Sequence, residues 1–401
     1  MKSTRLLRAI GDIDERYVIE AIQPRRRSVW MAVGAVAAFV AVTLSVMTAV
    51  HLNHKHNLIY PSDEPMSPTQ TPIQNKPQPD PQLPIIQVIP SDEGAMGYEG
   101  YIAPSFDDMN FPTPWQETDT IQTLPVYDNS VMAERYNATY DLTPTEEEKQ
   151  AMAADLIYMA KKLGIPDPQP VWNGDYLPCY SLAYGDYVLT AEDYRLRVFL
   201  PMPEGCSLET SDSYEALEAS AYRILEVYRD VIGLNNPRLA ISYGDYTIDG
   251  EQMWMNVQFY EQGNNPAETL RNYCFRSVHL FVWNDSSLQI SFDRLNLSTV
   301  IGEYALISVE EAEAALLEGY YVTSATDPFP GLDNIEQVEL VYRNAMWDNV
   351  FIPYYKFYVE EVTPLPGAAQ MGMKSYATYY VPAVQRQYIQ GLPLWDGSLN
   401  G

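Results

Sequence analysis

The chain has 401 residues, of which 53 are Asp or Glu and 25 are Lys or Arg, so its formal net charge is −28. This excess of acidic side chains excludes a protein that binds nucleic acid through a basic surface. Hydrophobic residues make up 46% of the chain, which is enough to build a core and excludes a wholly disordered protein.

Residues 1–28 combine a helical apolar pattern with a basic end. Five residues recur at the spacing of one helix face: Leu6, Ile10, Ile13, Tyr17 and Ala21. Gly11 either interrupts this helix or ends a first helix, in which case Asp12 caps a second one. A segment this short cannot build its own core, so we expect the apolar face to bind a cytosolic protein, the inner leaflet or a second copy.

Residues 29–50 are the one long stretch without a charged side chain. As a helix rising about 1.5 Å per residue, this stretch just crosses a hydrocarbon core of about 30 Å. Arg25, Arg26 and Arg27 precede it, which keeps the N-terminus in the cytosol and exports the rest. The stretch is too long for a cleaved signal peptide, so we expect a signal anchor: one transmembrane helix in a single-pass protein of the cell membrane.

Residues 51–141 are expected to form an extracytoplasmic stalk. A proline occurs every few residues between Pro65 and Pro90, which predicts an extended, semi-rigid spacer. Residues 94–137 lack clear periodicity and are predicted to be irregular, although Phe106, Phe111 and Trp115 can pack on the folded domain that follows.

Residues 142–300 are predicted to form a first exported unit. Thr143 as cap, Pro144 and Glu146 start a helix that Gly164 ends. A second helix is expected over residues 213–232, with one apolar face. Period-two alternation and turn residues predict strands at 194–200, 240–243, 253–260, 275–283 and 288–294.

Residues 301–390 are predicted to form a second exported unit, followed by a flexible C-terminus at 391–401. Ser308 and Glu311 form a capping box for a helix that ends at Gly319. Strands follow at 337–343, 350–360 and 376–381. Because a helix followed by antiparallel strands occurs twice, we expect an α+β fold with helices packed on antiparallel sheet, in two repeats.

Two segments resemble known families. The stretch LLRAIGDIDERYVIEA, followed by the arginine cluster and the apolar span, resembles the N-termini of bacterial anti-sigma-factor-like membrane proteins. The stretches ISVEEAEAALLEGYY, VELVYRNAMWDNVFIPYYKFYVEE and YATYYVPAV resemble PepSY-like units and the exported halves of accessory proteins that restrain sensor kinases. The first resemblance implies transmembrane regulation, and the second implies an α+β sensing or inhibitory module.

No catalytic set is recognisable. His279 is the only histidine after residue 56, and no G-x-S-x-G motif accompanies it, so we interpret it as structural. The chain has no phosphate-binding loop, dinucleotide-binding glycine motif or CxxC pair, so we expect no enzyme activity and no cofactor. His51, His54 and His56 lack a supporting carboxylate, so we interpret them as a solvated collar and predict no metal site.

Two features leave alternatives open. Tyrosines at alternate strand positions, such as Tyr376 and Tyr380, form either a face that binds carbohydrate or peptide or a half-buried sheet surface, and we favour the second. Cys179 and Cys206 are one candidate disulfide pair. The chain has three cysteines, and this odd number, with Cys274 left over, argues against a disulfide scaffold.

These patterns predict a membrane-anchored, anti-sigma-factor-like regulator. The exported domain would sense an extracytoplasmic signal, and the face from Leu6 to Ala21 would dock a sigma factor or another cytosolic regulator. The alternative is an extracytoplasmic binding or accessory module, associated with a kinase or the cell envelope, that binds a protein or peptide. In that case the tail is only an anchor in the lipid bilayer.

Overall fold

The computed structural model describes residues 83–89, 99–135, 143–174, 178–192, 194–247, 250–284, 287–323, 325, 327–345, 347–363 and 367–397. The chain divides into two units, residues 1–48 and 49–401, and every described residue belongs to the second.

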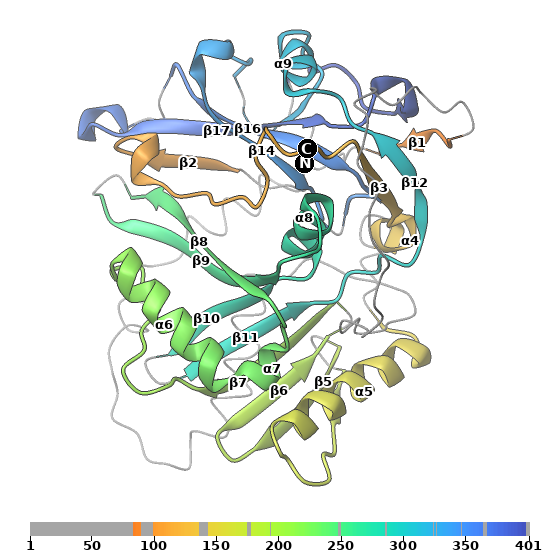
Figure 1. Cartoon of the computed structure of the whole chain (residues 1–401), viewed down its shortest axis with the longest axis vertical. Coiled ribbons are helices and arrows are strands. Elements are labelled where there is room, and N and C mark those ends of the chain that lie inside the picture. The colour runs from red at the N-terminus through yellow and green to blue at the C-terminus, as the bar shows by residue number, and fades with distance from the viewer. Residues whose placement is uncertain are drawn as a thin grey trace, which may run out of the picture. The chain divides into compact units, whose positions relative to one another are not determined.

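The largest sheet in the described residues has eight antiparallel strands in the order β4-β5-β6-β7-β11-β10-β9-β8 (Figure 1). Its strands are β4 (Val171–Asn173), β5 (Cys179–Tyr184), β6 (Tyr187–Ala191), β7 (Arg195–Pro201), β8 (Pro237–Tyr246), β9 (Gln252–Glu261), β10 (Val278–Asn284) and β11 (Ser287–Asp293). Side chains alternate along each strand, so this sheet has one apolar and one polar face. On β7, for example, Leu196 and Val198 are buried in the main core, whereas Arg195 and Arg197 point to the other face.

Three helices pack on the apolar face of this sheet: α5 (Glu146–Lys162), α6 (Tyr214–Val227) and α7 (Arg229–Ile232). The first helix begins two residues later than predicted, because its cap is Thr145 rather than Thr143. Thr145 accepts from the N–H of Glu148 and forms a capping box with that residue. Met152 and Leu156 of α5 are fully buried. The single helix predicted over 213–232 is divided into α6 and α7 at Tyr228.

A second sheet has five strands in the described residues, in the order β13-β17-β16-β14, with β2 paired to β17. These strands are β2 (Gly100–Ala103), β13 (Val322–Thr323), β14 (Ile335–Tyr342), β16 (Pro353–Glu360) and β17 (Lys374–Pro382). Helix α9 (Val309–Leu317) lies over one face of this sheet (Figure 1). Its buried residues pack with Phe357 and Tyr379 of that sheet. The capping box of Ser308 and Glu311 predicted for this helix is confirmed.

Smaller elements complete the described fold. A three-stranded sheet has the order β12-β3-β15, and a two-stranded parallel sheet pairs β1 with β18. Helix α8 contacts both β9 and β14. The bounds of these smaller elements are β1 (Ile86–Gln87), β3 (Thr123–Asp128), α4 (Ser130–Glu134), α8 (Pro266–Phe275), β12 (Val300–Ala305), β15 (Val350–Phe351) and β18 (Ile389–Gln390). Short 3-10 helices lie at Phe106–Asp108, Leu332–Asn334, Ala369–Met371 and Arg386–Tyr388.

The predicted α+β fold class is wrong, because the described residues form mainly β-sheet with few helices. The prediction did not include β4, β5 and β6, which enlarge the first sheet to eight strands. It also assigned residues 94–137 to an irregular stalk, whereas β2 and β3 of this range pair with β17 and β12. The expected packing of Phe106, Phe111 and Trp115 on the folded domain is confirmed.

The membrane predictions are also corrected. Among the residues described, no helix is long and apolar enough to cross a membrane. Residues 29–50, for which the sequence predicts the transmembrane helix, lie outside the described residues, as do residues 51–82 of the predicted stalk. The signal-anchor, single-pass and cell-membrane predictions therefore have no support from the structure.

Candidate ligand-binding cleft

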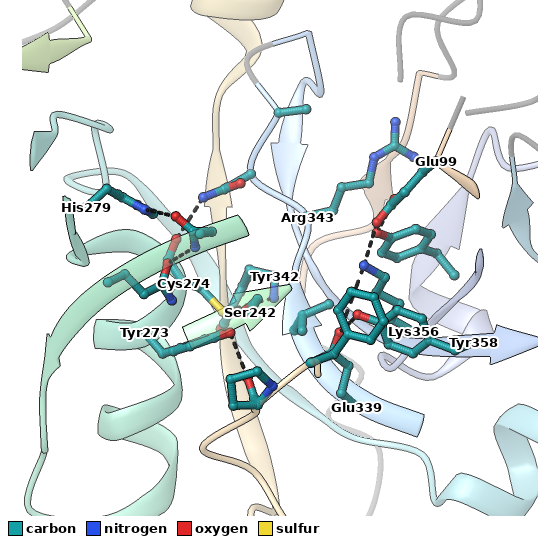
Figure 2. Close-up of a pocket in the computed structure, with 18 of the residues that line it drawn as sticks. Glu99, Ser242, Tyr273, Cys274, His279, Glu339, Tyr342, Arg343, Lys356 and Tyr358 are labelled. Carbon is teal, nitrogen blue, oxygen red and sulfur yellow. Dashed lines mark hydrogen bonds and ion pairs between the residues drawn. The ribbon is translucent and has the colours of Figure 1, made fainter. Parts of the chain in front are cut away.

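A cleft of about 470 Å³ is lined by residues of the polar face of the eight-stranded sheet and by residues of the second sheet. Figure 2 shows His279 and Tyr273 toward one side of this cleft and Glu99, Lys356 and Tyr358 toward the other. Its volume lies within the range of about 300–1,000 Å³ that is common for small-molecule sites.

Strand β2 and the segment after it connect the two sheets beside this cleft. While β2 pairs with β17, the N–H of Ile102 donates to Asp245 Oδ1 at the end of β8. Farther on, Asn110 pairs with Tyr243 of β8. Gly244 allows this close approach, because a Cβ at that position would lie 3.2 Å from side-chain atoms of Met109 and Phe111. The segment thereby places Phe111 in the lining of the cleft.

The first wall of the cleft carries a chain of hydrogen-bonded side chains. Trp254, Asn256 and Gln258 occupy alternate positions of β9 and so share one face. Asn256 Nδ2 donates to Gln258 Oε1 at 2.9 Å, so its Oδ1 is the acceptor 3.0 Å from His279 Nδ1. Because an amide oxygen only accepts, His279 Nδ1 carries a proton and is the donor in this contact.

Asp293 ends this chain of side chains on the first wall. His279 Nε2 lies 3.6 Å from Asp293 Oδ2, and Arg195 Nε donates to Asp293 Oδ1 at 2.9 Å. Burial alone would raise the pKa of Asp293, but the Arg195 guanidinium and the nearby His279 side chain outweigh it and hold the pKa well below its usual value. Asp293 is therefore a carboxylate at neutral pH.

The second wall of the cleft is built around Lys356. Lys356 lies between Glu339 of β14 and Tyr380 of β17 in the sheet register. Its Nζ is 2.5 Å from Glu99 Oε1 and 3.9 Å from Glu339 Oε1. Tyr380 donates to Glu99 Oε2 at 2.5 Å, and Tyr358 donates to Glu339 Oε1 at 2.6 Å.

These contacts shift the two glutamate pKa values in opposite directions. For Glu99, burial raises the pKa, but Lys356 and the hydrogen bonds from tyrosines outweigh burial, and the pKa lies below its usual value. For Glu339, burial dominates and raises the pKa despite the attraction of Lys356. Glu99 is thus the counter-ion of Lys356, while Glu339 accepts a hydrogen bond from Tyr358.

The end of β14 and helix α8 complete the lining. Arg343 Nε lies 3.1 Å from Asp348 Oδ2, and burial raises the pKa of Asp348 to about 6. Tyr273 of α8 donates to the carbonyl of Pro112 at 2.9 Å. Burial raises the pKa of the Cys274 thiol to about 12, so this cysteine is not a nucleophile at neutral pH.

Only some of the residues singled out from the sequence lie at the cleft. Leu6, Ile10, Ile13, Tyr17 and Ala21 lie outside the described residues, as do His51, His54 and His56. His279 and Tyr380 both line the cleft, whereas Tyr376 is fully buried in the second sheet. Cys179, Cys206 and Cys274 are free thiols, so the candidate disulfide is not formed.

Most residues that line the cleft were not singled out from the sequence. Glu99, Asn256, Asp293, Glu339 and Lys356 come from five separate segments of the chain. The sequence offers one weak signal for such residues, which is a polar residue inside an otherwise apolar strand. Lys356 is an example in the strand Pro353–Glu360.

Comparisons with known proteins give no family for this chain. No protein-family model matches it, and no curated protein matches it. The chain is similar to the crystal structure of an uncharacterized protein from Eubacterium rectale ATCC 33656. The alignment covers 66% of this chain and 84% of that protein, with 9% sequence identity and a TM-score of 0.31. A similarity at this level carries no argument about fold or function.

Proposed function

We propose that the described domain is a binding module and that the cleft between its two sheets takes a small polar ligand. The observation that carries the proposal is the polar character of a buried surface. Ser242, Gln258, Glu339 and Lys356 line the cleft and are all buried. Buried polar groups cost free energy unless they are hydrogen bonded, so a cavity walled by them suits a ligand that offers donors and acceptors.

The fixed orientation of the polar side chains on the first wall also supports ligand binding. Each of Asn256, His279 and Asp293 is held by a neighbour, so the wall presents its polar groups in fixed directions. A site whose polar groups are already oriented loses less entropy when a ligand binds. Aromatic rings of Trp254, Phe111 and Tyr358 lie beside these polar groups, which is the usual mixture in small-molecule sites.

This proposal corresponds to the binding-module alternative raised from the sequence, without its membrane location. The docking of a sigma factor or another regulator on the face from Leu6 to Ala21 stays a prediction, because these residues lie outside the described residues. A binding domain is compatible with that regulatory role, since ligand occupancy is the kind of signal that a regulator reports.

A thermal-shift screen of the full-length protein against polar metabolites, amino acids, short peptides, nucleosides and sugars tests the proposal. A ligand of the cleft should raise the melting temperature of the wild type and bind Asn256→Leu at least about tenfold more weakly, since that variant removes about 1.4 kcal/mol or more of polar contact. The matched control is Tyr184→Ala, which removes a 50% exposed side chain outside the cleft. If no compound binds, or if Asn256→Leu binds as the wild type does, the proposal is wrong.

A further inference from the structure

We infer that the ligand of the cleft is a sugar, whose ring packs on Trp254 and whose hydroxyl groups are bound by the side chains around His279. This inference rests on the proposed function and names the class of ligand. Three features of the cleft favour a sugar: an exposed tryptophan beside polar groups, hydrogen-bonding groups that suit hydroxyls, and charges that are already paired.

Trp254 offers an apolar surface at the cleft. Its side chain is 41% exposed and lines the cleft. Its neighbours on the same face of β9 are the polar residues Asn256 and Gln258. Its indole stacks with Phe111, with ring centroids 6.4 Å apart, which holds the ring in place. Pyranose rings present C–H groups on one face and hydroxyls at the edge. A fixed aromatic ring next to amides matches both parts of such a ligand.

Other side chains of this wall can form hydrogen bonds with ligand hydroxyl groups, which both donate and accept. The proton on His279 Nδ1 is engaged by Asn256, and the 3.6 Å between His279 Nε2 and Asp293 Oδ2 exceeds the usual hydrogen-bond length. Asp293 Oδ2 therefore retains capacity to accept from a hydroxyl. Ser242 adds a hydroxyl on the adjacent strand, opposite Asn256 in the register.

The paired charges favour a neutral ligand. Asp293 is paired with Arg195 at 2.9 Å, Glu99 with Lys356 at 2.5 Å, and Arg343 with Asp348 at 3.1 Å. A ligand with a full charge would have to displace one of these partners, which leaves a buried charge uncompensated. A sugar needs no counter-ion, and a volume of about 470 Å³ has room for one or two rings.

A peptide fits these walls less well. Extended peptides commonly bind by pairing their backbone with the edge of a sheet. Of the strands that line the cleft, β9, β10 and β16 are paired on both sides. The edge strand β14 is contacted by α8, and Cys274 Sγ of that helix accepts from the N–H of Tyr342. The cleft therefore presents side chains rather than free backbone donors and acceptors.

The test is isothermal titration calorimetry with the full-length protein and a defined set of sugars: glucose, galactose, mannose, N-acetylglucosamine and their β-linked and α-linked disaccharides. At least one sugar should bind the wild type. Trp254→Ala should weaken that binding at least tenfold, and Trp254→Phe should restore much of it, because phenylalanine keeps an aromatic face. Tyr184→Ala, the exposed aromatic outside the cleft, should bind as the wild type does.

The outcomes separate this inference from the proposed function. If no sugar binds while an amino acid, peptide or nucleoside binds and is lost in Asn256→Leu, the sugar inference is wrong and the binding cleft stands. If a sugar binds equally to the wild type, Trp254→Ala and Asn256→Leu, the location is wrong and both proposals fall. If no compound of any class binds, both also fall. Circular dichroism and a melting curve for each variant exclude loss of binding through misfolding.

Discussion

Lys356 Nζ lies 2.5 Å from Glu99 Oε1, although the two residues are 257 positions apart in the sequence. Glu99 directly precedes β2, and Lys356 lies in the middle of β16. The ion pair therefore joins the residues beside β2 to the centre of the second sheet, at the wall of the cleft. The carboxylate of Glu99 also accepts from Tyr380 and Tyr101, so both of its oxygens are engaged.

Lys356→Met should destabilise the fold, because it leaves the Glu99 carboxylate without its counter-ion. Breaking a buried ion pair from one side typically costs about 3–5 kcal/mol, and we expect about 3 kcal/mol because the Glu99 side chain keeps 25% of its surface exposed. Urea unfolding followed by fluorescence measures the change. The control is Lys374→Met, which breaks an exposed pair with Glu360 and should change stability much less. Equal losses in the two variants would contradict the role assigned to Lys356.

Asp348 should make stability depend on pH. Its folded pKa of about 6 lies above the unfolded value of 3.8, so the folded state binds the proton more tightly between these values. The free energy of unfolding should therefore rise as pH falls through 6 and level off near 3.8, by up to about 3 kcal/mol from this group. Asp348→Asn should flatten that part of the curve, as measured by urea unfolding between pH 4 and 8. A variant curve parallel to that of the wild type would show that Asp348 has an ordinary pKa.

The sequence predicted elements whose signals are local. Ser308 and Glu311 lie three residues apart and cap α9 as expected, because a capping box depends only on neighbouring residues. Helix α8 was missed although Asn265 and Pro266 form a start signal, because the apolar residues near Phe275 resemble the strand that follows. Short strands such as β4 and β13, of three and two residues, carry too few positions for an alternation to be recognised.

The cleft was beyond sequence reasoning for a different reason. A polar residue in a strand indicates a polar face, but its partner depends on which strands pair and how the sheets pack. Glu339 and Lys356 become neighbours only through the β14–β16 register, and Glu99 joins them only because β2 pairs with β17. His279 was interpreted as structural, and its contact with Asn256 arises from the neighbouring strand β9.

Thr145→Ala should destabilise the protein by about 1 kcal/mol through α5. The Thr145 hydroxyl accepts from the N–H of Glu148, and the Glu148 carboxylate accepts from the N–H of Thr145 at 2.6 Å. Losing an N-cap side chain typically costs about 1 kcal/mol. Thr145→Ser retains the hydroxyl and should stay within a few tenths of a kcal/mol of the wild type. Thermal unfolding of the three proteins measures the difference, and a serine variant as unstable as the alanine variant would argue against the cap.

The three free cysteines should react with iodoacetamide at different rates. Cys179 is buried, and burial raises the pKa of Cys274 to about 12, so both thiols should stay unmodified in the folded protein. Cys206 is partly exposed and should be alkylated first. Peptide mass spectrometry after timed labelling at pH 8 gives the order, and labelling in urea gives the full reaction of all three. Cys274 Sγ accepts from the N–H of Tyr342 at 3.4 Å, and rapid labelling of Cys274 in the folded state would contradict its raised pKa.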